Sequence, residues 1–200
     1  MPPPSSAVPL LAPPERVSGD EVLSQDDGAG PLFHRRYRTR IREPRLGAEE
    51  LMSSLASDVN QAAPTTFARF QRVRGEKHEM QLGDEYVVRM PGPWDGPVRV
   101  IDVSPRSFRL ATLEGHLEAG QVEFRVVPVS EGLLEFEIES WARSSGRLAD
   151  LLYHRLRMAK EIQAHMWISF LEGVVTLSGG KMAGGVWIET ERVEGADVGR

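Results

Sequence analysis

Hydrophobic residues occupy alternate positions from Phe33 to Glu43, with arginines between them, which is the pattern of a half-buried β-strand. From Ala48 to Ala63 the hydrophobic residues recur at helical spacing instead, and Pro64 follows them. This change of period predicts that the first strand is followed by one or two short amphipathic helices.

The stretch from Phe67 to Trp141 consists of short apolar runs separated by turn residues, a pattern typical of antiparallel strands. In its last run Glu135, Glu137 and Glu139 alternate with apolar residues, which predicts an acidic, solvated face. The expected strands are Phe67–Val73, Glu85–Met90, Val98–Val103, Phe108–Leu113, Val122–Val129 and Leu134–Trp141.

Helical spacing returns from Arg147 to about Val174, where the apolar residues form one long stripe. Such a stripe must be covered, and an antiparallel sheet with one apolar face can cover it. We therefore expect an α+β fold in which a curved antiparallel sheet of about six to seven strands grips a long C-terminal helix.

Both ends of the chain differ from this middle part. Residues 1–30 are rich in Pro, Ser and Gly and have no hydrophobic period, which predicts a disordered leader. Residues 178–200 contain two glycine pairs and are expected to be a glycine-rich tail that forms at most one short strand. The folded domain is accordingly expected over residues 31–177.

The amino-acid composition limits the classes of protein to which this chain can belong. A chain of 200 residues with 40% hydrophobic content suits one domain. Cysteine is absent, which removes disulfides, thiolate metal sites and cysteine nucleophiles, and fits a reducing compartment. No stretch approaches the roughly 20 apolar residues of a membrane span, so we expect a cytoplasmic protein.

The densest basic run, Arg35–Arg42, could bind phosphate or RNA. Alternating arginines also protect and solvate the edge of a sheet, and the net charge of −5 provides no overall attraction for nucleic acid. We favour the edge interpretation, so nucleic acid is not an expected partner.

Three segments carry a resemblance to a known family. They are Gly83–Val100, which contains the string Pro-Gly-Pro-Trp-Asp-Gly-Pro, together with Gly115–Gly120 and Ser140–Ser144. From Phe33 to Leu177 the chain resembles the bacterial and plant domain-of-unknown-function family nineteen-ninety, within the START-like helix-grip (SRPBCC) superfamily. The resemblance implies a cavity between sheet and helix, but no particular activity.

His116 and Glu118 are the best candidates for catalysis, because an imidazole and a carboxylate two residues apart could share a proton. The alternative is a hairpin turn whose polar side chains are capped or solvated. The sequence contains no metal-binding signature, phosphate loop or dinucleotide fingerprint, so we expect no metal and no cofactor.

The leading functional hypothesis is a module that binds a hydrophobic or amphipathic small molecule in the cavity. One alternative is a polyketide-cyclase-like enzyme that uses acid–base chemistry in the same cavity, and another is a protein-interaction domain without a ligand. The sequence does not define an oligomeric state. The expected ligand-binding residues are Tyr86, Trp94, His116, Trp141 and Met166.

Overall fold

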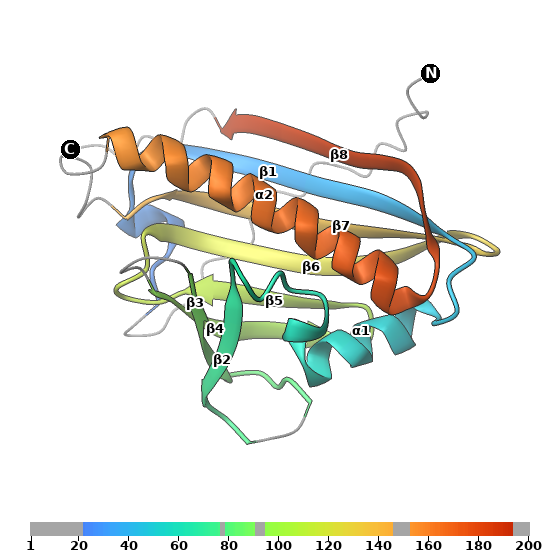
Figure 1. Ribbon diagram of the computed structural model, residues 1–200. Helices are drawn as coiled ribbons and strands as arrows, with labels where there is room; N and C mark the ends of the chain where they lie inside the picture. Colours follow the sequence, from blue (N-terminus) through green and yellow to red (C-terminus); the bar gives the residue numbers. More distant parts are fainter. Residues whose placement is uncertain (1–21, 77–78, 91–94, 146–152, 194–200) are drawn as a thin grey trace.

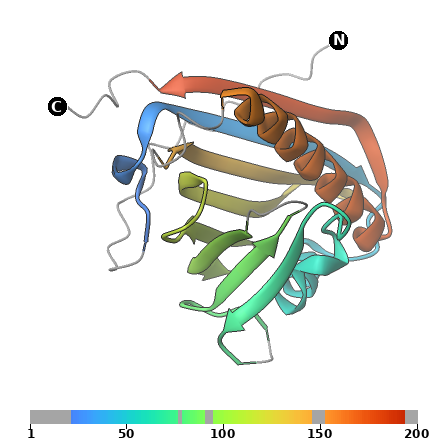
Figure 2. The same cartoon turned by 60° about the vertical axis from the view of Figure 1, so that its left-hand side comes forward.

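An eight-stranded antiparallel sheet dominates the computed structural model, which describes residues 22–76, 79–90, 95–145 and 153–193. The sheet curves around helix α2 (Tyr153–Ser178), which crosses its concave side, and helix α1 (Ala48–Ser57) lies at one end of α2 (Figures 1 and 2). The predicted α+β fold class is confirmed. The sheet has eight strands, however, where we expected about six to seven.

The strand order across the sheet is β2-β3-β4-β5-β6-β7-β1-β8, so β2 to β7 follow the sequence and β1 lies between β7 and β8. A tight turn joins β4 and β5, in which Ser104 Oγ accepts the backbone N–H of Ser107 at 3.0 Å. The remaining elements are β1 Ala29–Arg42, η1 Gln25–Asp27, η2 Val59–Gln61, β2 Arg69–Arg74, β3 Glu85–Arg89, β4 Asp95–Ser104, β5 Ser107–Thr112, β6 Glu118–Ser130, β7 Leu133–Ser144 and β8 Lys181–Val193.

The additional strand, β8, comes from the segment that the sequence indicated to be a glycine-rich tail. It pairs with β1 along its whole length, from the Arg42–Lys181 pair to the Leu32–Val193 pair. Gly184 and Gly185, with φ angles of 87° and 92°, form a bulge in this pairing. We interpreted these glycines as linker residues, but here they supply the positive φ that a bulge needs.

The folded region also begins earlier than predicted. Val22 forms a β-bridge with Leu113, and Leu23 N–H donates to the carbonyl of Thr112 at 2.9 Å. Ser24 then caps η1, where its backbone N–H donates to Asp27 Oδ2 at 2.8 Å. Residues 22–30 of the expected leader are therefore part of the fold, whereas residues 1–21 lie outside the described residues.

The helix predicted over Ala48–Ala63 is divided in two at Asp58. The Asp58 carboxylate accepts the backbone N–H of Asn60 at 2.9 Å and starts η2. The Asn60 side-chain amide then donates to the carbonyl of Phe70 at 2.9 Å and accepts its N–H at 2.8 Å. These two hydrogen bonds attach η2 to β2. A helix that continued without interruption through Asp58 would not bring Asn60 to Phe70.

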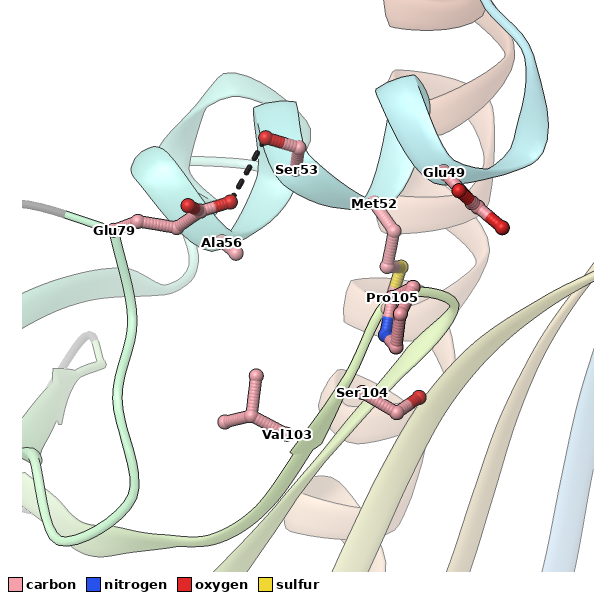
Figure 3. Close-up of a pocket in the computed structure, with 8 residues that line it drawn as sticks. All are labelled: Glu49, Met52, Ser53, Ala56, Glu79, Val103, Ser104 and Pro105. Atoms are coloured by element: carbon pink, nitrogen blue, oxygen red, sulfur yellow. Dashed lines mark hydrogen bonds between the residues drawn. The ribbon is translucent and has the colours of Figure 1, made fainter.

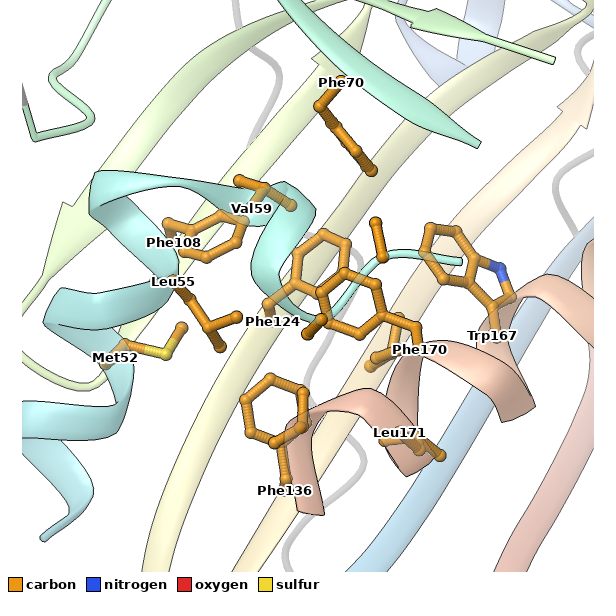
Figure 4. Packing of buried hydrophobic residues seen from close by; sticks show 14 of the residues in the cluster. Met52, Leu55, Val59, Phe70, Phe108, Phe124, Phe136, Trp167, Phe170 and Leu171 are labelled. Carbon is orange, nitrogen blue, oxygen red and sulfur yellow. The ribbon is translucent and has the colours of Figure 1, made fainter. Parts of the chain in front are cut away.

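Aromatic side chains fill the space between the sheet, α1 and the C-terminal part of α2 (Figure 4). Phe124 lies at the centre, with its ring centroid 4.7 Å from that of Phe108 and 5.3 Å from that of Phe170. Trp167 contacts Phe124 edge-on at 5.6 Å. This aromatic cluster holds the helix in the curve of the sheet and occupies that part of the interior.

Helix α2 approaches η2 most closely at Gly173, where an added Cβ would collide with the backbone carbonyl of Ala62. Helix propensity alone favours Gly173→Ala by about 1 kcal/mol. Because a backbone carbonyl cannot rotate away, we expect the variant instead to lower the free energy of unfolding by about 1–3 kcal/mol in urea denaturation. Thr176→Ala, at an exposed position of the same helix, is the control, and stabilisation by Gly173→Ala would contradict the prediction.

The acidic row of β7 is not a solvated face. Glu137 and Glu139 are only 4% and 2% exposed, although alternation does place them opposite the apolar face of the strand. Arg36 binds the Glu137 carboxylate through Nε and Nη2, both at 3.1 Å. The strand β1 is not at an edge either, since it lies between β7 and β8. Its arginines Arg36, Arg38 and Arg40 form ion pairs with glutamates of these two neighbouring strands.

Candidate functional site

Polar side chains lie on the concave face where it extends beyond the aromatic cluster towards the N-terminal part of α2. Alternation along β1 places Arg35 and Tyr37 on this face, and Glu118 begins β6. Gln163 of α2 donates from Nε2 to Glu118 Oε2 at 2.8 Å, while Arg35 Nη1 lies 3.6 Å from Glu118 Oε1. We call Arg35, Tyr37, Glu118 and Gln163 the concave polar cluster.

Arg35 is the least satisfied member of this cluster. Its side chain is 9% exposed, and its Nη1 is buried without a hydrogen-bond partner. The guanidinium carbon lies 5.0 Å from the centroid of the Phe33 ring, at cation–π distance. Arg35 is thus a largely buried cation, and its Nη1 finds no hydrogen-bond acceptor among the described residues.

Burial and two neighbouring charged groups shift the pKa of the Tyr37 hydroxyl. Burial raises the pKa of the Tyr37 hydroxyl, the charge of Arg35 opposes that rise, and the Glu118 carboxylate adds to it. The raised pKa keeps the hydroxyl protonated at neutral pH. The cluster therefore presents a neutral hydroxyl, an amide, a carboxylate and a guanidinium on one face.

His116 contacts the backbone of Glu118 and not its carboxylate. The Glu118 N–H donates to His116 Nδ1 at 2.9 Å, and Nδ1 also lies 3.0 Å from the Glu118 carbonyl oxygen. The other ring nitrogen faces Gly96, where a Cβ would lie 2.9 Å from Nε2. Desolvation lowers the pKa of His116 against the opposing charge of the Glu118 carboxylate. A neutral His116 therefore stabilises the turn that positions Glu118.

The other expected ligand-binding residues are dispersed. Met166 is 6% exposed and faces the sheet as part of the apolar core. Tyr86 is also in this core, but on β3, where the Arg72 guanidinium lies 5.2 Å from its ring centroid. Trp94 lies outside the described residues. Of Met166 and Tyr86, Met166 is the one near the concave polar cluster, one helical turn from Gln163.

Trp141 does not line the interior. It shares the outer face of β7 with Glu139, and its ring stacks on His34 at a centroid distance of 5.1 Å and an interplanar angle of 5°. His34 Nε2 lies 2.6 Å from Glu139 Oε1. Trp141 is 2% exposed, so it packs within a polar network on the convex side, and its expected role as a cavity residue is wrong.

Sequence reasoning missed Arg35, Tyr37 and Gln163 as site residues. A signal for Arg35 was present, because the consecutive arginines Arg35 and Arg36 cannot face the same side of a strand. Since Tyr37 follows at the next odd position, Arg35 belongs to the apolar side. The sequence provides no comparable signal for Gln163.

A separate hollow of about 190 Å³ lies between α1 and the β4–β5 turn (Figure 3). Its one drawn hydrogen bond joins Ser53 Oγ to Glu79 Oε1 at 2.8 Å. That contact is satisfied within the protein, so this hollow is a weaker candidate than the concave polar cluster. Its lining residues are Glu49, Met52, Ser53, Ala56, Glu79, Val103, Ser104 and Pro105.

Neither a candidate metal site nor a candidate membrane span occurs in the described ranges. His, Asp and Glu do not gather there in any group of three that could hold a metal ion. None of the helices in those ranges is long and apolar enough to span a bilayer.

Residues 20–170 match the family model described as Domain of unknown function (DUF1990), and the chain belongs to this family. The fold resembles that of a conserved protein from Geobacillus kaustophilus, with 13% identity, a TM-score of 0.51, and coverage of 74% of this chain and 98% of that chain. It also resembles norcoclaurine synthase from Thalictrum flavum in complex with dopamine and hydroxybenzaldehyde.

For norcoclaurine synthase the identity is 12% and the TM-score 0.53, with coverage of 83% of this chain and 96% of that chain. At such low identity both likenesses show the fold alone. They agree with the START-like helix-grip fold predicted from the sequence. No curated protein matches the chain.

Proposed function

We propose that this protein binds a hydrophobic or amphipathic small molecule on the concave face, between the sheet and α2. The observation that carries the proposal is the convergence of polar side chains from β1, β6 and α2 beside apolar ones. On the concave side of β6, Val122 lies between Glu118 and Phe124. Met166 lies on the side of α2 that faces the sheet. A few polar groups beside an apolar wall are typical of small-molecule sites.

The fold comparison supports the same proposal. The norcoclaurine synthase with a similar fold was determined in complex with two small organic molecules, dopamine and hydroxybenzaldehyde. In this chain the aromatic cluster around Phe124 occupies the other end of the interior. The proposed ligand therefore lies towards the N-terminal part of α2.

The alternative of an acid–base enzyme has less support. His116 Nδ1 is engaged by the backbone of Glu118, and Nε2 packs against Gly96. A general base needs an accessible ring nitrogen within hydrogen-bond reach of the substrate. We therefore assign His116 a positioning role for Glu118, and not proton transfer.

Native mass spectrometry with added 1-dodecanol, a neutral amphiphile, tests the proposal. The wild-type protein should bind one probe molecule. Val122→Trp, which places a large side chain on the concave face of β6, should abolish binding. Val127→Trp is the matched control, since Val127 lies on the opposite face of the same strand and is 46% exposed; this variant should bind like the wild type.

The same measurement can contradict the proposal. If neither 1-dodecanol nor any co-purified small molecule adds mass to the wild-type protein, binding on the concave face is rejected. Equal loss of binding in both tryptophan variants would place the probe elsewhere.

A further inference from the structure

We propose that the polar end of the ligand is an anion, such as a carboxylate, and that Arg35 holds it on the concave face. This inference rests on the proposed small-molecule function and specifies the chemistry of the ligand. It begins from the unmet donors of Arg35, a residue at the centre of the concave polar cluster.

A guanidinium group has five N–H donors in a planar fork. Within the described residues the Arg35 side chain donates no hydrogen bond, and the closest carboxylate oxygen, Glu118 Oε1, is 3.6 Å away. Leaving buried donors unsatisfied costs free energy, and a bound oxygen acceptor would recover it. Arg35 Nη1 can thus bind an acceptor that none of the described residues supplies.

Arg36 and Arg125 differ from Arg35 in this respect, although Arg38, Arg109 and Arg143 also have a buried Nε without a hydrogen-bond partner. Arg36, whose side chain is 13% exposed, binds Glu137 through two nitrogens at 3.1 Å. Arg125, 14% exposed, lies 2.5 Å from Glu137 and 2.7 Å from Glu139. These arginines have carboxylate oxygens within hydrogen-bond distance, whereas Arg35, although more buried, has only the Glu118 carboxylate at 3.6 Å. The missing partner is therefore best matched by a ligand carboxylate, which can bind a guanidinium in bidentate fashion.

Glu118 does not fill this role, because α2 holds its carboxylate. Gln163 Nε2 donates to Glu118 Oε2 at 2.8 Å, and the other oxygen remains beyond hydrogen-bond distance from Arg35. An incoming anion would lie close to Glu118 and be repelled by it. Glu118 consequently moderates the affinity of Arg35 for anions.

The apolar surroundings indicate where the rest of the ligand lies. The Phe33 ring packs against Arg35, and Val122 and Met166 continue the concave face towards the aromatic cluster. An anionic head at Arg35 with an apolar tail along this face satisfies both parts of the site. The ligand class is an amphipathic anion.

Calorimetric titration of the full chain with dodecanoate and 1-dodecanol tests this assignment, at about pH 8, where the carboxylate is ionised. The wild type should bind dodecanoate at least about 10-fold more tightly than 1-dodecanol. Arg35→Gln should remove this preference, because it weakens dodecanoate binding by a much larger factor than 1-dodecanol binding. Arg38→Gln, on the outer face of the same strand, is the control and should keep the preference.

Glu118→Gln provides a test in the opposite direction. It keeps a hydrogen-bonding group for Gln163 but removes the repelling charge, so dodecanoate should bind about 3-fold more tightly or better. A purely structural role of Glu118 would weaken both probes or neither. If Arg35→Gln does not fold, Arg35→Lys, which keeps the charge but loses the planar fork, should weaken dodecanoate alone.

The outcomes separate the two proposals. If the wild type binds 1-dodecanol and dodecanoate equally, or if Arg35→Gln weakens both to the same extent, the anion assignment is overturned and small-molecule binding stands. No gain of dodecanoate affinity in Glu118→Gln also overturns it. If neither probe binds the wild type, the proposed function itself fails.

Discussion

A chain that ends at Gly180 is expected to lose its cooperative fold. It lacks β8, so β1 becomes an unprotected edge of the sheet and loses every backbone hydrogen bond on that side. The truncation also removes Glu189, which lies 2.6 Å from Arg38, and the carbonyl of Gly185, which accepts Thr39 Oγ1–H at 3.0 Å. The combined loss is comparable with the whole stability of an ordinary domain, about 5–15 kcal/mol.

Circular dichroism during heating measures this effect. The truncated chain should show no cooperative transition and should aggregate, because a long exposed edge strand pairs with other chains. A chain that ends at Val193 keeps all of β8 and is the control; it should unfold like the full-length protein. Cooperative unfolding of the chain that ends at Gly180 would show that β8 is dispensable.

Glu139→Gln is expected to lower the free energy of unfolding by about 3 kcal/mol at neutral pH. The carboxylate is 3% exposed and contacts His34 at 2.6 Å and Arg125 at 2.7 Å on the convex side of the sheet. Removing its charge takes from Arg125 one of its two close carboxylates, Glu137 being the other, and takes from His34 its carboxylate partner. Glu135→Gln is the matched control on the same face of β7; its carboxylate is 17% exposed, and the loss should stay below about 1 kcal/mol.

The effect of Glu139 should depend on pH in a defined direction. Burial opposes its ionisation, but the His34 hydrogen bond and the charges of Arg125, His34 and Arg36 outweigh burial and hold the Glu139 pKa below the ordinary 4.5. A depressed folded-state pKa stabilises the fold above 4.5, and this contribution disappears as the pH falls through the folded-state value. Urea denaturation should therefore show the wild type and Glu139→Gln converging in acid, and a constant difference at all pH values would contradict this.

Much of the fold could be predicted because secondary structure follows a local period. Alternation from Phe33 to Glu43 and helical spacing up to about Val174 identified β1 and α2, although α2 ends at Ser178. Prediction failed where a local signal was ambiguous. Glycine pairs are equally compatible with a linker and with a bulge, and only pairing with β1 made the segment after Gly180 a strand.

The site was less predictable than the fold. His116 and Glu118 were correctly expected to lie together, but the contact between them runs through the backbone of Glu118. Whether an alternating residue faces the helix or the outside depends on which way the sheet curves. Trp141 was expected to bind a ligand, although it continues the row of Glu135, Glu137 and Glu139 and packs on the convex side against His34.

The sequence by itself determined the order of the elements, the alternating faces of the strands and the fold class. These properties depend on backbone geometry and on side chains close together along the chain. Only the tertiary structure decided that Arg35 is buried beside Glu118 and Gln163 and that Glu139 is buried beside His34. Both facts depend on contacts between residues far apart in the sequence. The Glu139–His34 contact forms when β1 pairs with β7, and the Glu118–Gln163 contact forms when the sheet packs against α2.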